Sequence, residues 1–177
     1  MNQSIIKKCQ KIKLVLTDVD GVLTDGSMYY SKHGEELKKF NTRDGMGVEL
    51  LQNKGIMTIM VTKEKSLISI KRAKKIKVKE ICSGIINKEK EIYRISKKYN
   101  VPFSNIAYIG DDVNDLQPLK ICGFSATPAD GHDELKKIVH YTCKMKGGYG
   151  AFRELVDMIL FSQKNKQELI IGQKDKK

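Results

Sequence analysis

The chain has 177 residues, of which 40% are hydrophobic and 31% are charged, and this composition suits one compact domain with a core of its own. Its net charge of +12 could attract nucleic acid, an anionic membrane surface or an anionic substrate. No aromatic or basic motif supports a nucleic-acid-binding module. The basic cluster at 71–79 is typical of a solvated helix face, and residues 164–177 predict a flexible basic tail.

Four cysteines are spread along the chain without a CxxC pair, which disfavours a zinc site or a disulfide framework: Cys9, Cys82, Cys122 and Cys143. No apolar run approaches the roughly 20 residues that span a bilayer. The N-terminus has only Ile5 and Ile6 where a signal peptide needs a longer apolar stretch. We therefore expect a cytoplasmic protein without a membrane partner.

Short apolar runs alternate with longer helical patterns, which predicts an α/β fold with a parallel sheet and crossover helices. Strands are expected at 12–16, Met57–Val61, Glu80–Cys82, Ile106–Ile109, Phe124–Thr127 and 139–142. Helices are expected at 45–53, 66–76, Lys88–Tyr99, 112–120 and 150–162. All of them belong to a single expected domain over residues 1–163.

One insertion interrupts this alternation at residues 26–40. Met28 and Tyr30 alternate with other residues, a turn follows near Gly34, and Leu37 and Phe40 come next. The pattern predicts a β-hairpin that leaves the first strand. The insertion is too short to form a separate domain.

The first predicted strand ends directly at two carboxylates, Asp18 and Asp20. Open α/β sheets bind their ligands at the carboxyl ends of their strands. Two aspartates beyond an apolar run also need a metal, hydrogen bonds or solvent. Taken alone, the pattern fits equally well a polar turn that Gly21 closes.

The fourth predicted strand also ends in acids, with Asp111, Asp112 and Asp115 in the five residues after Gly110. They could be a helix N-cap with acids in its first turn. If the two strands are neighbours, however, four or five carboxylates converge and would repel each other without a cation. Oxygen ligands in that number, without histidine or cysteine, suit Mg²⁺.

Thr62 ends the second predicted strand, and Lys88 begins a predicted helix. Each alone is typical of a helix cap or of an exposed helix residue. In this order along the chain, they supply a hydroxyl and an ammonium group for phosphate oxygens.

With these four motifs in order, the chain resembles the haloacid dehalogenase superfamily of phosphatases over about residues 11–160. The resemblance implies a Rossmann-like three-layer sandwich with a mostly parallel central sheet and no large cap domain. It implies that Asp18 is the nucleophile and that Asp20 protonates the leaving oxygen and then activates water. Thr62 and Lys88 would hold the phosphoryl oxygens.

The same resemblance implies one Mg²⁺ ion as the cofactor. Asp18, the backbone carbonyl of Asp20, and Asp111 would ligate it. Asp112 would support this shell of ligands, and Asp115 would do so less directly.

Longer segments narrow the resemblance to phosphatases of 3-deoxy-2-ulosonic acids: TDVDGVLTDG, KKFNTRDGMG, IAYIGDDVND and GGYGAFRE. These include KDO 8-phosphate phosphatases and relatives that act on nine-carbon acids such as KDN or N-acylneuraminate 9-phosphate. The resemblance implies a homotetramer, in which Gly147 and Gly148 belong to a flexible lid over a neighbour's site. Truncation before Lys146 should then reduce turnover without unfolding the chain. Without the family, the glycines fit a plain loop.

The residues after Thr62 separate the two substrate classes. Members of the eight-carbon branch resemble one another in having TGR at this position, and members of the nine-carbon branch resemble one another in having TGE. This chain has Thr62-Lys63-Glu64 instead. Glu64 and Lys75 could therefore contact the sugar, or both could be solvated helix residues. Arg72 completes the expected substrate-binding set. Lys63 in place of glycine differs from both branches.

A phosphatase for KDO 8-phosphate is the favoured function, and one for a nine-carbon acid is the alternative. A phosphomutase or a dehalogenase is disfavoured, because superfamily mutases usually carry a cap domain that 177 residues do not accommodate. A non-catalytic partner of a sugar-nucleotide synthetase is disfavoured because Asp18 and Asp20 are both present.

Overall fold

The computed structural model describes residues 2–174 and, up to residue 164, their side chains. Six strands form one parallel sheet in the order β5-β4-β1-β6-β7-β8. The strands are β1 (Leu14–Thr17), β4 (Met57–Val61), β5 (Glu80–Cys82), β6 (Ile106–Ile109), β7 (Phe124–Thr127) and β8 (Tyr141–Thr142). This sheet confirms the predicted parallel α/β architecture.

Alternate residues of the central strands supply two separate cores, one on each face of the sheet. Val15, Met60 and Ala107 pack into the first core, whereas Leu16 and Ile59 pack into the second. Both faces of the central strands are therefore buried, which explains their continuous apolar runs.

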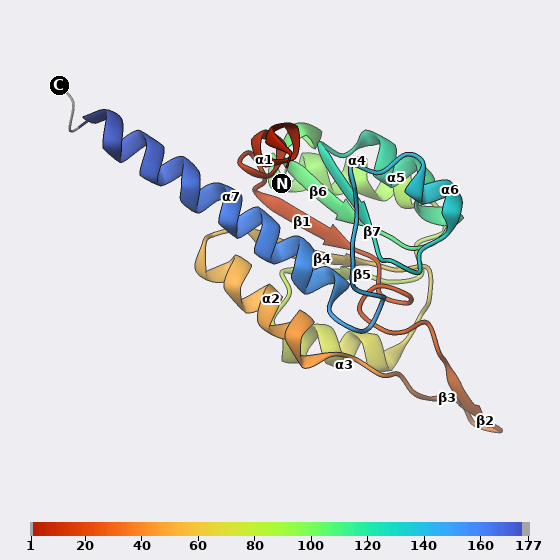
Figure 1. Cartoon of the computed structure of the whole chain (residues 1–177). Coiled ribbons are helices and arrows are strands. Elements are labelled where there is room, and N and C mark those ends of the chain that lie inside the picture. Colours follow the sequence, from red (N-terminus) through yellow and green to blue (C-terminus); the bar gives the residue numbers. More distant parts are fainter. Residues whose placement is uncertain (1, 175–177) are drawn as a thin grey trace.

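The helices complete a three-layer sandwich (Figure 1). The first core is covered by α1 (Gln3–Cys9), α2 (Thr42–Asn53), α3 (Leu67–Lys75) and α7 (Ala151–Lys174). The second core is covered by α4 (Lys88–Tyr99), α5 (Leu116–Ile121) and α6 (Asp133–Lys136). Two short 3₁₀ turns lie at Phe103–Asn105 and Val113–Asp115. Among the described residues, no helix is long and apolar enough to cross a membrane.

The predicted insertion is a two-stranded antiparallel hairpin, β2 (Tyr29–Ser31) and β3 (Gly34–Leu37), which protrudes from the sandwich (Figure 1). An isolated antiparallel bridge between Thr24 and Phe40 closes its base. The hairpin leaves from the loop after β1 and returns to α2, so its base lies at the carboxyl edge of the sheet.

Several element boundaries differ from the sequence-based expectation. Helix α1 was not predicted, because its seven residues contain few apolar side chains. Helix α2 begins three residues before the predicted start, at Thr42, where the Asn41 side chain accepts a hydrogen bond from the Arg43 amide. The predicted strand at 139–142 forms only at Tyr141–Thr142.

Helix α7 is longer than the predicted segment at 150–162 and runs to Lys174. Residues 175–177 of the predicted tail lie outside the described residues, and the flexibility of 164–177 stays a prediction. The expectation that truncation before Lys146 spares the fold is wrong, because α7 buries Phe152, Leu155 and Val156 in the first core.

Candidate active site

The predicted carboxylates meet where the strand order changes direction. From β1 the chain first adds β4 and β5 on one side, and then β6, β7 and β8 on the other. Strands β1 and β6 are adjacent, with Thr17 opposite Ile109. Asp18 and Asp111 therefore emerge at neighbouring strand ends, at the switch point where such sheets bind ligands.

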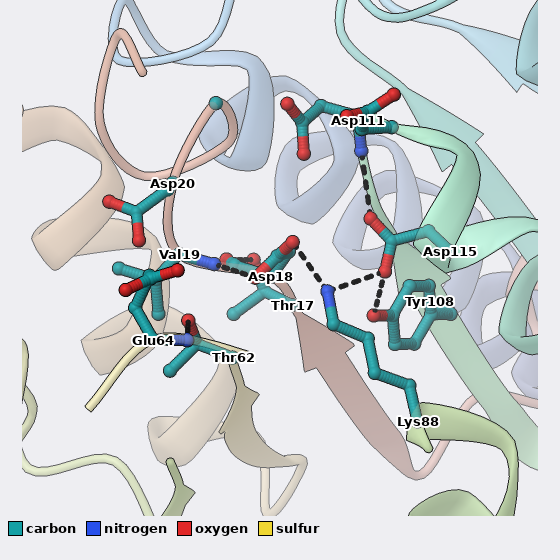
Figure 2. Close-up of polar contacts among 12 residues, drawn as sticks. Thr17, Asp18, Val19, Asp20, Thr62, Glu64, Lys88, Tyr108, Asp111 and Asp115 are labelled. Carbon is teal, nitrogen blue, oxygen red and sulfur yellow. Dashed lines mark hydrogen bonds and ion pairs between the residues drawn. The ribbon is translucent and has the colours of Figure 1, made fainter. Parts of the chain in front are cut away.

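A buried ion triplet forms the centre of the site (Figure 2). The Lys88 ammonium lies 2.5 Å from Asp18 Oδ2 and 2.7 Å from Asp115 Oδ1. Asn87 caps α4 by accepting a hydrogen bond from the Lys90 amide, and this fixes Lys88 as the first residue of the helix. The second Asp18 oxygen, Oδ1, accepts a hydrogen bond from the Val19 amide at 2.6 Å.

Asp115 organises this cluster more directly than the sequence suggests. Its Oδ1 also accepts a hydrogen bond from the Tyr108 hydroxyl at 2.5 Å, and its Oδ2 accepts one from the Asp111 amide at 3.2 Å. Tyr108 is fully buried on β6. Sequence analysis missed Tyr108, because a tyrosine in a buried strand carries no motif that separates it from a core residue.

Electrostatics favour a cation at this point. Burial and the charge of Asp115 raise the pKa of Asp18 well above its ordinary value, although Lys88 partly opposes this. Burial and Asp115 likewise raise the pKa of Asp111 to about 7. Burial lowers the pKa of Lys88, but Asp18 and Asp115 raise it by more, so its ammonium group stays charged. Asp18 and Asp111 thus lack sufficient positive charge from the protein alone.

The donor set fits a hard divalent cation. Carboxylate oxygens of Asp18, Asp111 and Asp115 lie within 4.8 Å of one another. Both carboxylate oxygens of Asp115 already accept hydrogen bonds, from Lys88, Tyr108 and the Asp111 amide. Asp18 and Asp111 are therefore the better ligands for a cation. All-oxygen ligation of this kind is typical of Mg²⁺.

Asp112 is not one of the three carboxylates that lie within 4.8 Å of one another, and the supporting role that the resemblance implies stays a prediction. Its side chain is exposed and accepts a hydrogen bond from the Val113 amide at 2.8 Å, which caps the short 3₁₀ turn. The buried Asp115, in contrast, contacts Lys88, Tyr108 and the Asp111 amide directly.

Asp20 lies on the opposite side of Asp18 from Lys88 (Figure 2). Lys38, in the segment that follows β3, lies 2.7 Å from Asp20 Oδ1. The Thr24 hydroxyl donates to the same oxygen at 3.4 Å. Sequence analysis assigned no role to Lys38, because its contact with Asp20 depends on how the hairpin folds back.

Thr62 takes the position expected at the end of β4, the other neighbour of β1. It is buried, and its hydroxyl oxygen accepts a hydrogen bond from the Glu64 amide at 3.2 Å, so the hydroxyl hydrogen is available to a ligand. Glu64 is exposed beside it. Asp18, Asp20, Thr62, Lys88 and Asp111 therefore all lie at one edge of the sheet.

Arg72 and Lys75 are not brought to this cluster. The Arg72 guanidinium donates to the Asn41 carbonyl at 3.0 Å and lies 5.5 Å from the Phe40 ring centre. Lys75 is exposed at the last residue of α3. Both line a cavity of about 570 Å³ between α2 and α3. The contact of Arg72 and Lys75 with substrate therefore stays a prediction.

Gly147 and Gly148 pack against the loop that carries Asp20. A Cβ atom on Gly147 would lie 1.9 Å from the Gly21 carbonyl oxygen, and one on Gly148 would lie 2.4 Å from the Asp25 amide nitrogen. The Gly148 amide also donates to the Val22 carbonyl at 2.9 Å. A side chain at either position would therefore clash within the same chain, which explains why both residues are glycine. Their role over a neighbour's site stays a prediction.

Comparison with known proteins agrees with this geometry. The model of the family described as haloacid dehalogenase-like hydrolase matches residues 5–150. A 3-deoxy-D-manno-octulosonate 8-phosphate phosphatase from Haemophilus influenzae is 39% identical over 157 residues, which cover 89% of this chain and 87% of the relative.

Two solved structures are similar throughout. The cobalt-bound form of that Haemophilus influenzae phosphatase superposes with a TM-score of 0.86, over 88% of this chain and 91% of the other. The enzyme of the same name from Moraxella catarrhalis, in complex with magnesium, phosphate and KDO, is 33% identical. It superposes with a TM-score of 0.90, over 97% of this chain and 99% of the other.

Proposed function

The chain belongs to the haloacid dehalogenase-like hydrolase family and is a phosphatase, and from this premise we propose that it hydrolyses KDO 8-phosphate with Mg²⁺ through an aspartyl-phosphate on Asp18. The observation that carries the mechanism is the buried cluster of Asp18, Lys88, Asp115 and Asp111 at the sheet's switch point. The substrate is inferred from the relatives of that name.

In the first step, a carboxylate oxygen of Asp18 attacks phosphorus and the bond to the sugar oxygen breaks. Lys88 and the Thr62 hydroxyl hold the phosphoryl oxygens as charge builds on them. Lys88 is already fixed by Asp115, so little reorganisation is needed at the moment of reaction.

Asp20 transfers the protons of both steps. It gives a proton to the leaving sugar oxygen and then takes one from the water that attacks phosphorus, which releases phosphate and restores Asp18. Its position on the same loop, two residues after the nucleophile, suits both transfers.

Asp18, the Asp20 carbonyl and Asp111 would hold the Mg²⁺ ion, which supplies positive charge that offsets both the carboxylates and the phosphoryl oxygens. Burial and the charge of Asp115 raise the pKa of Asp111 to about 7, so binding of a cation near neutral pH would release a proton from this group.

A nine-carbon acid phosphate, such as KDN 9-phosphate, is the second candidate substrate. The exposed Glu64 lies two residues beyond Thr62, and its amide donates to the Thr62 hydroxyl oxygen. Its position supports a role for the Glu64 carboxylate in accepting hydrogen bonds from a sugar near the proposed phosphate-binding end of β4.

We further infer a homotetramer in which a neighbouring subunit closes each site. Apolar side chains are exposed on the hairpin, including Tyr30 at 65% and Leu37 at 63%. Arg72 and Lys75 line a separate cavity between α2 and α3, which fits contact with a substrate bound by another subunit. The four cysteines are buried and free, which fits a reducing, cytoplasmic location.

Phosphate release from KDO 8-phosphate, KDN 9-phosphate and N-acetylneuraminate 9-phosphate, measured side by side, tests this function. We expect the highest kcat/KM for KDO 8-phosphate, a strict requirement for Mg²⁺, and no turnover by Asp18→Asn. Preference for a nine-carbon acid would assign specificity to Glu64. Release that persists without divalent metal, or in Asp18→Asn, would contradict the proposed reaction.

A further inference from the structure

We propose that Lys38 is a positioning residue for Asp20: it holds one carboxylate oxygen, Oδ1, so that Oδ2 remains free to exchange a proton with the leaving group. The inference rests on the proposed reaction and assigns a role to a side chain outside the four motifs. The ammonium of the buried Lys38 contacts the carboxylates of Asp20 and Glu35, so we place Lys38 behind Asp20 and not against the substrate.

The contact between Lys38 and Asp20 is buried on the lysine side. The ammonium lies 2.7 Å from Asp20 Oδ1 and 3.1 Å from Glu35 Oε1. Burial lowers the pKa of Lys38, but its hydrogen bonds with the two carboxylates raise it by more, so the group is charged. A charge held in this way has a well-defined position, because leaving it unpaired in a buried site is costly.

The two oxygens of Asp20 have different surroundings. Oδ1 receives Lys38 and the Thr24 hydroxyl. Oδ2 is buried and has no hydrogen-bond partner among the side chains that the structure describes. Since native structures rarely leave a buried polar atom unsatisfied, Oδ2 is the oxygen reserved for a reactant.

Lys38 is itself fixed by a network that joins three segments. Glu35 on β3 accepts hydrogen bonds from Lys38 through Oε1 and from the Ser66 hydroxyl through Oε2. The Ser66 hydroxyl oxygen in turn caps α3 by accepting from the Ser69 amide. The base of the hairpin thus connects α3 to the Asp20 loop, and the orientation of the Asp20 carboxylate depends on this connection.

The leaving group provides a test that a loss of stability would not imitate. An alkyl phosphate needs a proton on its leaving oxygen, whereas p-nitrophenol leaves readily as the anion. Because kcat/KM reports the steps up to the first irreversible one, it isolates phosphoryl transfer to Asp18. We expect Lys38→Met to lower kcat/KM for the sugar phosphate roughly 100-fold, as loss of general acid catalysis does. The loss for p-nitrophenyl phosphate should be roughly tenfold smaller.

Four further variants complete the experiment. Asp20→Asn should show the same selective loss, and adding Lys38→Met to it should cost little more, since the two residues act as a unit. Lys38→Arg should restore part of the activity towards the sugar phosphate. If Lys38→Met does not fold, Glu35→Gln, which keeps a hydrogen-bonding partner for Ser66, should show a smaller loss with the same selectivity.

Equal losses for both substrates, or full additivity with Asp20→Asn, would overturn the role of Lys38. Failure of the proposed reaction itself would look different, because wild-type enzyme would then turn over p-nitrophenyl phosphate no faster than Asp18→Asn.

Discussion

At the residue scale, the site depends on charges that are buried and paired. Asp18, Lys88 and Asp115 are nearly inaccessible, and each contacts an opposite charge. The aspartates, Thr62 and Lys88 could be predicted because their motifs follow strands in a fixed order. Tyr108, Lys38 and Glu35 could not, because their partners come from distant segments and no local pattern marks them.

Asp44 is a buried carboxylate outside the active site. Its Oδ1 accepts a hydrogen bond from the Arg153 amide at 2.9 Å in the first turn of α7, while Oδ2 is buried without a partner among the described side chains. Burial raises its pKa to about 6, although the Arg153 amide and the charges of Arg72 and Arg153 lower it. Burial, Glu154 and Asp44 in turn raise the pKa of the buried Cys143 thiol.

Asp44 should therefore make stability depend on pH. A carboxyl with a raised pKa in the folded state favours folding when it is protonated, so its contribution is lost as pH rises from about 4 to about 6. We expect the free energy of unfolding of Asp44→Asn to increase relative to that of wild type as pH rises across this range. The increase should be at most about 3 kcal/mol. Urea unfolding at a series of pH values measures the difference, with the exposed Asp157→Asn as control. A pH-independent difference would contradict the assignment.

At the scale of elements, the sheet was the most predictable part. Strands β4, β5, β6 and β7 and helix α4 have the predicted bounds, because continuous apolar runs and strong caps mark them. Helix α1 was missed because few of its residues are buried. The order of the strands, and therefore the meeting of Asp18 with Asp111, follows from packing on both faces and not from any local signal.

The loop after β1 offers a matched pair of glycine variants. Gly21 and Gly26 both have positive φ, at 78° and 76°, so alanine strains the backbone similarly at each. Only at Gly21 would the new Cβ overlap the metal-binding region, 1.8 Å from Asp111 Oδ2, whereas at Gly26 the nearest atom lies 3.8 Å away.

We expect Gly21→Ala to raise the Mg²⁺ concentration needed for half-maximal activity by tenfold or more, as losses around metal ligands typically do. Gly26→Ala should change stability but leave the Mg²⁺ requirement near that of wild type. Titration of activity with Mg²⁺ compares the two. An equal shift in both variants would show that backbone strain, and not the approach to Asp111, is responsible.

At the scale of the whole molecule, the protruding hairpin would connect the proposed assembly to the Asp20 loop. Its apolar side chains are exposed in the single chain, while Lys38 and Glu35 at its base reach the Asp20 loop. Burial of the hairpin in an assembly would therefore also restrain Lys38 and Glu35, and through them the Asp20 loop. The sequence predicted the hairpin from its alternation and turn, but not this contact with Asp20.

If the hairpin mediates assembly, Leu37→Asp should dissociate the tetramer, because a charge would then be buried in the interface. Turnover should fall with the assembled fraction. Sedimentation over a range of concentrations measures the species present. The control is Tyr93→Asp on α4, where a large hydrophobic side chain is also exposed but lies away from the hairpin. This variant should leave the assembly intact. A wild-type monomer at micromolar concentration would contradict the proposed assembly.

Covalent labelling of Asp18 during turnover tests the central mechanism most directly. Enzyme, Mg²⁺ and an aryl phosphate with radiolabelled phosphorus are mixed and quenched with acid within one turnover, and the label is mapped to a peptide. We expect label on the peptide that contains Asp18, none in Asp18→Asn, and accumulation in Asp20→Asn, where water is not activated. The aspartyl-phosphate would be contradicted if the enzyme released phosphate but neither wild type nor Asp20→Asn carried any protein-bound label.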